Sequence, residues 1–208
     1  MAKLPVEPYV AQVRDLFQGI DLENKLVDQD KLDQAVELIL EANKIDDPPV
    51  NVNDLAKRLN FDVYFLNLPQ NILGVMFDTK EPFEYHSQRA IVLGSQYDNL
   101  RNIGTAAHEF GHYFMQCNAD TDYYDTRHIE ADTISEMNAN RFRDTLLLPD
   151  GIVKKFLRKR QWRKWDKILE EARETFFVPR HLIRPRFERI LKRSIVDDVV
   201  FDGSGLDG

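Results

Sequence analysis

Two histidines four residues apart lie inside a long helical pattern, and this combination restricts the fold more than any other part of the sequence. From Asn99 apolar residues recur at helical spacing for about five turns, and His108 and His112 lie within that run, with Glu109 beside the first. Residues four apart on a helix differ by about 40° in direction, so the two imidazoles face the same way. The residues around them are small or apolar, which predicts a buried helix. The core must therefore form around a helix that carries three polar side chains.

Two imidazoles on one face of a buried helix are typical of a zinc site. A buried cluster of unpaired polar groups is costly, and a metal ion offsets that cost. Glu109 follows the first imidazole, where a carboxylate can take a proton from a metal-bound water without binding the metal itself. The pattern predicts a Zn²⁺ ion held by His108 and His112, with Glu109 as the general base of a hydrolytic reaction.

A catalytic zinc has three protein ligands and one open position, so a third ligand is expected. The metzincin continuation of the motif needs glycine and histidine at positions 115 and 118, where this chain has Met115 and Asn118. The third ligand should then lie on a later element. The candidates are His128, Glu130, Asp132 and Glu136.

Glu136 is the best placed of these candidates, because it lies in a helical pattern with a buried apolar stripe. Asn140 lies one turn further along the same face and can hold a ligand imidazole through the N–H that does not face the metal. The acids at 130 and 132 are more typical of the first turn of a helix, where negative charge is favourable.

Three short runs rich in aromatic and β-branched residues precede the long helix and predict β-strands over 61–66, 72–77 and 89–93. Their short connections favour an antiparallel meander. The predicted fold class is α+β, mostly helical, with a small three-stranded antiparallel sheet, a zincin-like helix packed on that sheet, and a helical C-terminal region. The helical patterns cover about 10–17, 32–40, 53–59, 99–114, 129–148 and most of 151–193.

Charge is unevenly distributed along the chain. Residues 151–193 carry 15 Lys/Arg against 5 Asp/Glu, in a chain of net charge −7. This basic region is either a solvated surface that balances the acidic body or a charged docking face. Its tryptophans, Trp162 and Trp165, are three apart and are expected to be buried. The segments predicted from these patterns are an N-terminal helical segment 1–47, a zincin-like core 48–150, the basic helical region 151–193, and an acidic, glycine-rich tail 194–208.

Charge and hydropathy also limit the partners and the compartment. A chain with a pI of about 5.3 repels polyanions, so we expect the basic region to dock a protein rather than a nucleic acid. No window approaches the ~18 consecutive apolar residues of a membrane span. The chain begins without an apolar leader, and Cys117 is its single cysteine. We therefore expect a cytoplasmic protein that does not enter the membrane.

The motif at 108–112 belongs to a longer series that resembles a known family. It continues as Tyr113-Phe114, and is followed by Glu136-Met137-Asn138-Ala139-Asn140-Arg141-Phe142 and by Leu146-Leu147-Leu148-Pro149. This series is similar to the ImmA/IrrE metallo-endopeptidases, whose pattern is H-E-φ-G-H-[YF], then E-x-x-A-[ND]-x-F and a Leu-Leu-Met-Pro-like end. The resemblance covers about residues 50–150 and is weaker over 165–193. It implies Glu136 as the third ligand and Asn140 as the partner of a ligand imidazole. At 143 and 144 the chain has arginine and aspartate, where the family usually has small residues.

The resemblance implies a cytoplasmic zinc-dependent endopeptidase with a regulatory role, acting on a specific protein such as a helix-turn-helix repressor encoded nearby. Two alternatives remain: a nucleic-acid-associated regulator that uses the basic region and has a vestigial metal site, or a toxin of a toxin–antitoxin pair. Zinc peptidases often stabilise the oxyanion with a phenol or an imidazole. The candidates here are Tyr97, Tyr113, Tyr123 and Tyr124, and the sequence does not choose among them.

Overall fold

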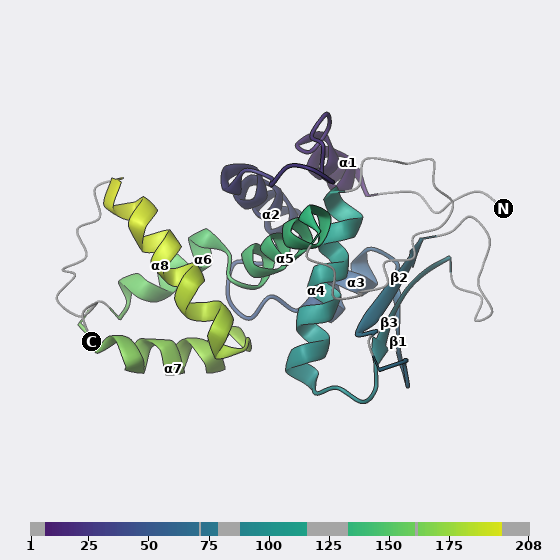
Figure 1. Ribbon diagram of the computed structural model, residues 1–208. Coiled ribbons are helices and arrows are strands. Elements are labelled where there is room, and N and C mark those ends of the chain that lie inside the picture. Colours follow the sequence, from purple (N-terminus) through teal and green to yellow (C-terminus); the bar gives the residue numbers. More distant parts are fainter. Residues whose placement is uncertain (1–6, 71, 79–87, 116–132, 161, 197–208) are drawn as a thin grey trace.

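The computed structural model describes residues 7–70, 72–78, 88–115, 133–160 and 162–196. This part of the chain is mostly helical with one three-stranded sheet, which confirms the predicted α+β class (Figure 1). The elements are α1 (Pro8–Asp15), α2 (Gln29–Asn43), α3 (Val52–Arg58), β1 (Asp62–Leu66), β2 (Gly74–Asp78), β3 (Arg89–Gly94), α4 (Asn99–Met115), α5 (Ile134–Leu147), α6 (Asp150–Arg158), α7 (Trp165–Phe176) and α8 (Arg180–Val196).

The sheet is mixed, so the predicted antiparallel meander is wrong in its strand order. β3 lies in the middle, parallel to β1 and antiparallel to β2, with Ile91 opposite both Val63 and Met76. β1 and β2 follow each other in the chain but do not pair, because β3 lies between them. β3 is therefore covered on both edges, and nearly all of its residues are buried. β1 is half-exposed at the edge.

Side-chain caps fix where several helices begin. Asp28 accepts a hydrogen bond from the backbone N–H of Asp30 at the start of α2, and Asn51 caps α3 in the same way. Thr133 caps α5 by accepting from the N–H of Glu136. The described part of α5 therefore begins at Ile134, whereas the sequence pattern predicted a start near 129. Residues 116–132, which include three of the predicted ligand candidates, lie outside the described residues.

Helix α4 forms the centre of the fold. It contacts β2 and β3 of the sheet, α5, and also α1 and α3 (Figure 1). Every residue from Thr105 to Met115 is buried. Its aromatic residues continue the core in both directions: Phe110 packs edge-on against Phe61 before β1, and Phe114 stacks on Phe142 of α5. The predicted packing of this helix on the sheet is thus confirmed.

The C-terminal helices α6, α7 and α8 lie on the far side of α5 from the sheet (Figure 1). The expectation that both tryptophans are buried is wrong for Trp162, which is 92% exposed. Trp162 lies in the turn before α7, so its spacing from Trp165 does not place the two on one helix face. Trp165 is half-buried and packs edge-on against Phe187 of α8.

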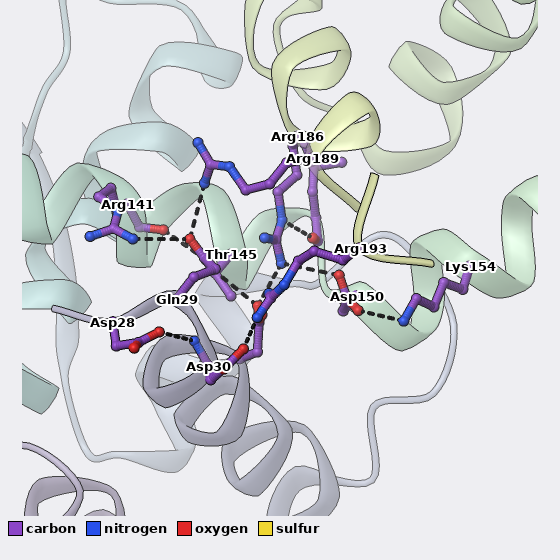
Figure 2. A network of polar contacts seen from close by, with 12 residues as sticks. Asp28, Gln29, Asp30, Arg141, Thr145, Asp150, Lys154, Arg186, Arg189 and Arg193 are labelled. Carbon is purple, nitrogen blue, oxygen red and sulfur yellow. Dashed lines mark hydrogen bonds and ion pairs between the residues drawn. The ribbon is translucent and has the colours of Figure 1, made fainter. Parts of the chain in front are cut away.

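Much of the basic charge of α8 lies along the acidic body, as Figure 2 shows. Arg186 is buried and donates to Asp33 of α2 and to the carbonyl of Leu148. Arg193 pairs with Asp33 and with Asp30. These contacts join α8 to α2 across the end of α5. None of the described helices is long and apolar enough to cross a membrane.

Candidate metal centre

Helix α4 brings two imidazoles to one buried point. The Nε2 atoms of His108 and His112 lie 3.1 Å apart, and both rings are almost entirely enclosed. This is the consequence of the i, i+4 spacing on an uninterrupted helix. Glu109, which follows His108, is fully buried.

Helix α5 brings a carboxylate to the same point from its first turn. Glu136 places Oε2 3.0 Å from Nε2 of His108 and Oε1 3.2 Å from Nε2 of His112. One ligand atom from each of these three residues lies within 4.8 Å of the others. Of the predicted site residues that the structure describes, it therefore brings together His108, His112 and Glu136. His128, Glu130 and Asp132 lie outside the described residues.

The two helices can approach closely because of a glycine. A Cβ added at Gly111 would lie 3.0 Å from both the Cα and the carbonyl oxygen of Ala139, and 3.2 Å from Cβ of Phe142. Real Cβ atoms rarely come so near backbone atoms, so a larger residue would separate α4 from α5. Gly111, the fourth residue of the motif, thus sets how far Glu136 stands from the histidines.

Asn140 contacts the ring edge of His108 that faces away from Glu136. Its Oδ1 lies 3.0 Å from Nδ1 of His108. Because an amide oxygen can only accept, this Nδ1 carries the hydrogen, and Nε2 keeps its lone pair on the side of His112 and Glu136. The sequence predicts that Asn140 holds a ligand imidazole, and its contact with Nδ1 of His108 is the contact that this role requires.

Charges around the site favour a cation. Burial lowers the pKa of His112, but the hydrogen bond to Glu136 and the charges of Glu109 and Glu136 outweigh it, so that the pKa is raised above its ordinary value. A positive charge at this point is therefore stabilised by the two carboxylates, whether a proton or a metal ion carries it.

The donor set fits a zinc ion. Two imidazole nitrogens and a carboxylate oxygen are a common set of three protein ligands for catalytic zinc. Ligands about 2.1 Å from one ion in tetrahedral geometry stand roughly 3.4 Å apart, and the contacts among His108, His112 and Glu136 measure 3.0–3.2 Å.

A cavity of about 440 Å³ opens beside His108. Thr105 on α4 and Arg143 on α5 line it, together with His181 and Leu182 from the start of α8. It is large enough for several side chains of a peptide. A second cavity, of about 470 Å³, lies between α2 and α6 and is lined by none of the candidate ligands. The cavity beside His108 is therefore the candidate substrate cleft.

The remaining tyrosine candidates occupy different surroundings. The ring of Tyr113 packs edge-on against Phe61, with the guanidinium of Arg14 over it, and burial raises the pKa of its phenol. The hydroxyl of Tyr97 donates to the carbonyl of Gln70. Tyr123 and Tyr124 lie outside the described residues.

Sequence reasoning missed two contributors to this site. Arg143 donates to Asn140, and the signal for this contact was their i, i+3 spacing on α5. Residues of α8 form one wall of the cleft, and no pattern near the motif predicts this, because α8 begins about 70 residues further along the chain.

The chain is similar in sequence to known proteins. The profile of the M78 peptidases, described as the IrrE N-terminal-like domain, matches residues 56–188. A similar protein is the uncharacterized immunity region protein 2 of Bacillus phage phi105, 27% identical over 123 residues, which are 59% of this chain and 71% of that one. A solved structure of a Mycobacterium tuberculosis transcriptional regulator aligns with 85% of this chain at 14% identity and a TM-score of 0.48. This chain spans 50% of that regulator. Because the profile covers more than half of its length, the chain belongs to the IrrE N-terminal-like family of M78 peptidases.

Proposed function

We propose that the protein is a zinc-dependent endopeptidase. The observation that carries the proposal is the meeting of His108, His112 and Glu136 at one buried point beside a cleft. Membership of a peptidase family supports hydrolysis of a peptide bond. In this proposal the three residues hold the metal, and Glu109 is the general base.

A zinc ion bound there would supply a water of lowered pKa and a positive charge for the developing oxyanion. The chain's own groups then do the rest. Glu109, whose charge acts on the imidazole of His112, accepts a proton from the attacking water and returns it to the leaving amine. Asn140 keeps His108 oriented by accepting from its Nδ1–H. The cleft beside His108 positions the peptide.

The substrate we propose is a specific regulatory protein, such as a helix-turn-helix repressor encoded nearby, cleaved in the cytoplasm. The phage relative is named for an immunity region, which supports a regulatory setting. A single scissile bond carries little information, so a regulatory peptidase needs contacts outside the cleft to select one protein.

Metal content tests the proposal first. The purified protein should contain close to one zinc per chain. His108→Ala and His112→Ala should each lose it, because two remaining ligands hold zinc poorly. Elemental analysis after gel filtration gives the measurement, and full retention of zinc in both variants would exclude the site.

Glu109→Gln then separates metal binding from chemistry. The amide has a similar shape but cannot take up the proton of the water. We expect this variant to keep its zinc and lose cleavage of a co-expressed repressor. An active Glu109→Gln enzyme would show that another group is the base.

The two alternatives make different predictions. A nucleic-acid-associated regulator would shift duplex DNA at physiological salt, and reversing the charges of Arg158 and Lys159 would abolish the shift. Arg160 does not suit this test, because it pairs with Glu171 and lies over the ring of Phe156. A toxin would instead copurify with a tightly bound partner.

A further inference from the structure

One amide oxygen on α5 accepts from two donors at once. Oδ1 of Asn140 lies 3.0 Å from Nδ1 of His108 and 2.9 Å from Nη1 of Arg143. The other two nitrogens of the same guanidinium, Nε and Nη2, lie 2.9 and 2.7 Å from Oδ1 of Asp144. Asp144, Arg143 and Asn140 thus form a polar chain that ends on His108.

The orientation of this amide decides which nitrogen of His108 carries the hydrogen. If the amide were turned by 180°, its NH₂ group would face the ring, and Nδ1 would have to accept. The hydrogen would then sit on Nε2, the atom that faces His112 and Glu136. An imidazole nitrogen that carries a hydrogen cannot bind a metal.

The guanidinium of Arg143 makes the turned orientation of the Asn140 amide unfavourable. A guanidinium has five N–H donors and no acceptor, and it is always charged. Turning Asn140 would point an NH₂ group at that positive charge, so that donor faces donor. Asp144 holds the guanidinium in position through two hydrogen bonds, and the side chains of Arg143 and Asp144 are only 23% and 30% exposed. The bonds are thus partly shielded from water.

We propose that Arg143 is a positioning residue, which fixes the amide of Asn140 and thereby keeps the hydrogen of His108 on Nδ1. The proposal rests on the proposed metal role of His108, because without a metal the carboxylate of Glu136, 3.0 Å from Nε2, would itself favour a hydrogen on that atom. If Arg143 only formed an ion pair with its chain neighbour, its removal would leave His108 unchanged.

The direct test is the zinc affinity of the purified protein, measured by chelator competition. We expect the affinity to fall about tenfold in Arg143→Leu, because the amide of Asn140 is then free to turn and to oppose the tautomer that can bind the metal.

Arg101→Leu is the matched control. Arg101 lines the same cleft and carries the same charge, but it extends over the ring of Tyr97 and has no recorded contact with Asn140 among the described residues. We expect this variant to keep the wild-type zinc affinity. An equal loss in both variants would mean that charge near the metal, and not the amide, is what matters.

Asn140→Asp provides a second, independent test. A carboxylate has only acceptor oxygens, so it cannot present a donor to His108 in either orientation. In this background Arg143→Leu should no longer lower the zinc affinity. The proposal is overturned if Arg143→Leu keeps the wild-type affinity, or if it lowers the affinity equally with asparagine and with aspartate at 140. A wild-type protein that binds no zinc would instead refute the proposed function.

Discussion

At the candidate metal centre Glu136 contacts both imidazoles, one with each carboxylate oxygen. Glu136→Ala should therefore weaken zinc binding more than any other single change on α5. Asn140→Ala, which removes only the partner of His108, should cost roughly 10–100-fold in metal affinity. Chelator competition ranks the variants. Glu130→Ala and Asp132→Ala serve as controls that keep zinc, and loss of zinc in Glu130→Ala alone would show that the third ligand has been misassigned.

Residue spacing predicted which side chains would meet at this centre, because helix geometry fixes their direction. His108 and His112 share a face by their separation of four, and Glu136 and Asn140 share another face for the same reason. The contact between the two faces depends on how the helices pack, which no local pattern specifies. Arg143 was missed because an arginine on a helix is ordinarily a solvated residue.

At the scale of elements, the approach of α4 to α5 depends on Gly111. Gly111→Ala should destabilise the protein by about 1–3 kcal/mol, because the new methyl group meets backbone atoms of Ala139 and not a flexible side chain. Zinc affinity should fall as well, since α5 carries Glu136. Gly104→Ala is the control on the same helix: its Cβ would have open space, so it should stabilise by up to about 1 kcal/mol. Urea unfolding measures both, and equal effects would contradict this account of the helix contact.

The elements themselves were mostly predictable, but the order of the strands was not. Alternation and aromatic content located β1, β2 and β3 to within about two residues. Their order is a property of the assembled sheet, and burial along each strand does not reveal it, because β2 at the edge is buried almost as fully as β3 in the middle. The short connection after β1 favoured a hairpin, yet β3 and not β2 pairs with β1.

Across the whole molecule, the C-terminal helices contribute to the cleft although they lie far from the motif in sequence. His181 and Leu182, at the start of α8, line the cavity that contains His108. Part of the basic charge of this region lies along the acidic body, where Arg186 and Arg193 pair with acids of α2 (Figure 2). Composition could not predict these partners, because no local sequence pattern records ion pairs between residues more than 150 positions apart.

The position of α8 should therefore depend on Arg186. This side chain is 2% exposed and donates to Asp33 and to the carbonyl of Leu148. Asp33 keeps its contact with Arg193 in Arg186→Ala, but it loses one charged donor, and the carbonyl of Leu148 loses the donor that Arg186 supplies. We expect a loss of about 2 kcal/mol in the free energy of unfolding. Arg184 on the same helix is 53% exposed and pairs with Glu188, so Arg184→Ala should cost no more than about 1 kcal/mol.

Urea unfolding of the two variants shows whether Arg186 holds α8 in place or contributes no more than an exposed surface arginine does. Zinc content should be unchanged in both, because neither arginine contacts the metal centre in the described residues. Peptide cleavage should fall in Arg186→Ala alone, since a displaced α8 removes one wall of the cleft. Similar small losses of stability in the two variants would mean that α8 is held by its apolar face, where Phe187 packs against Phe156 and Phe176, and not by the arginine contacts.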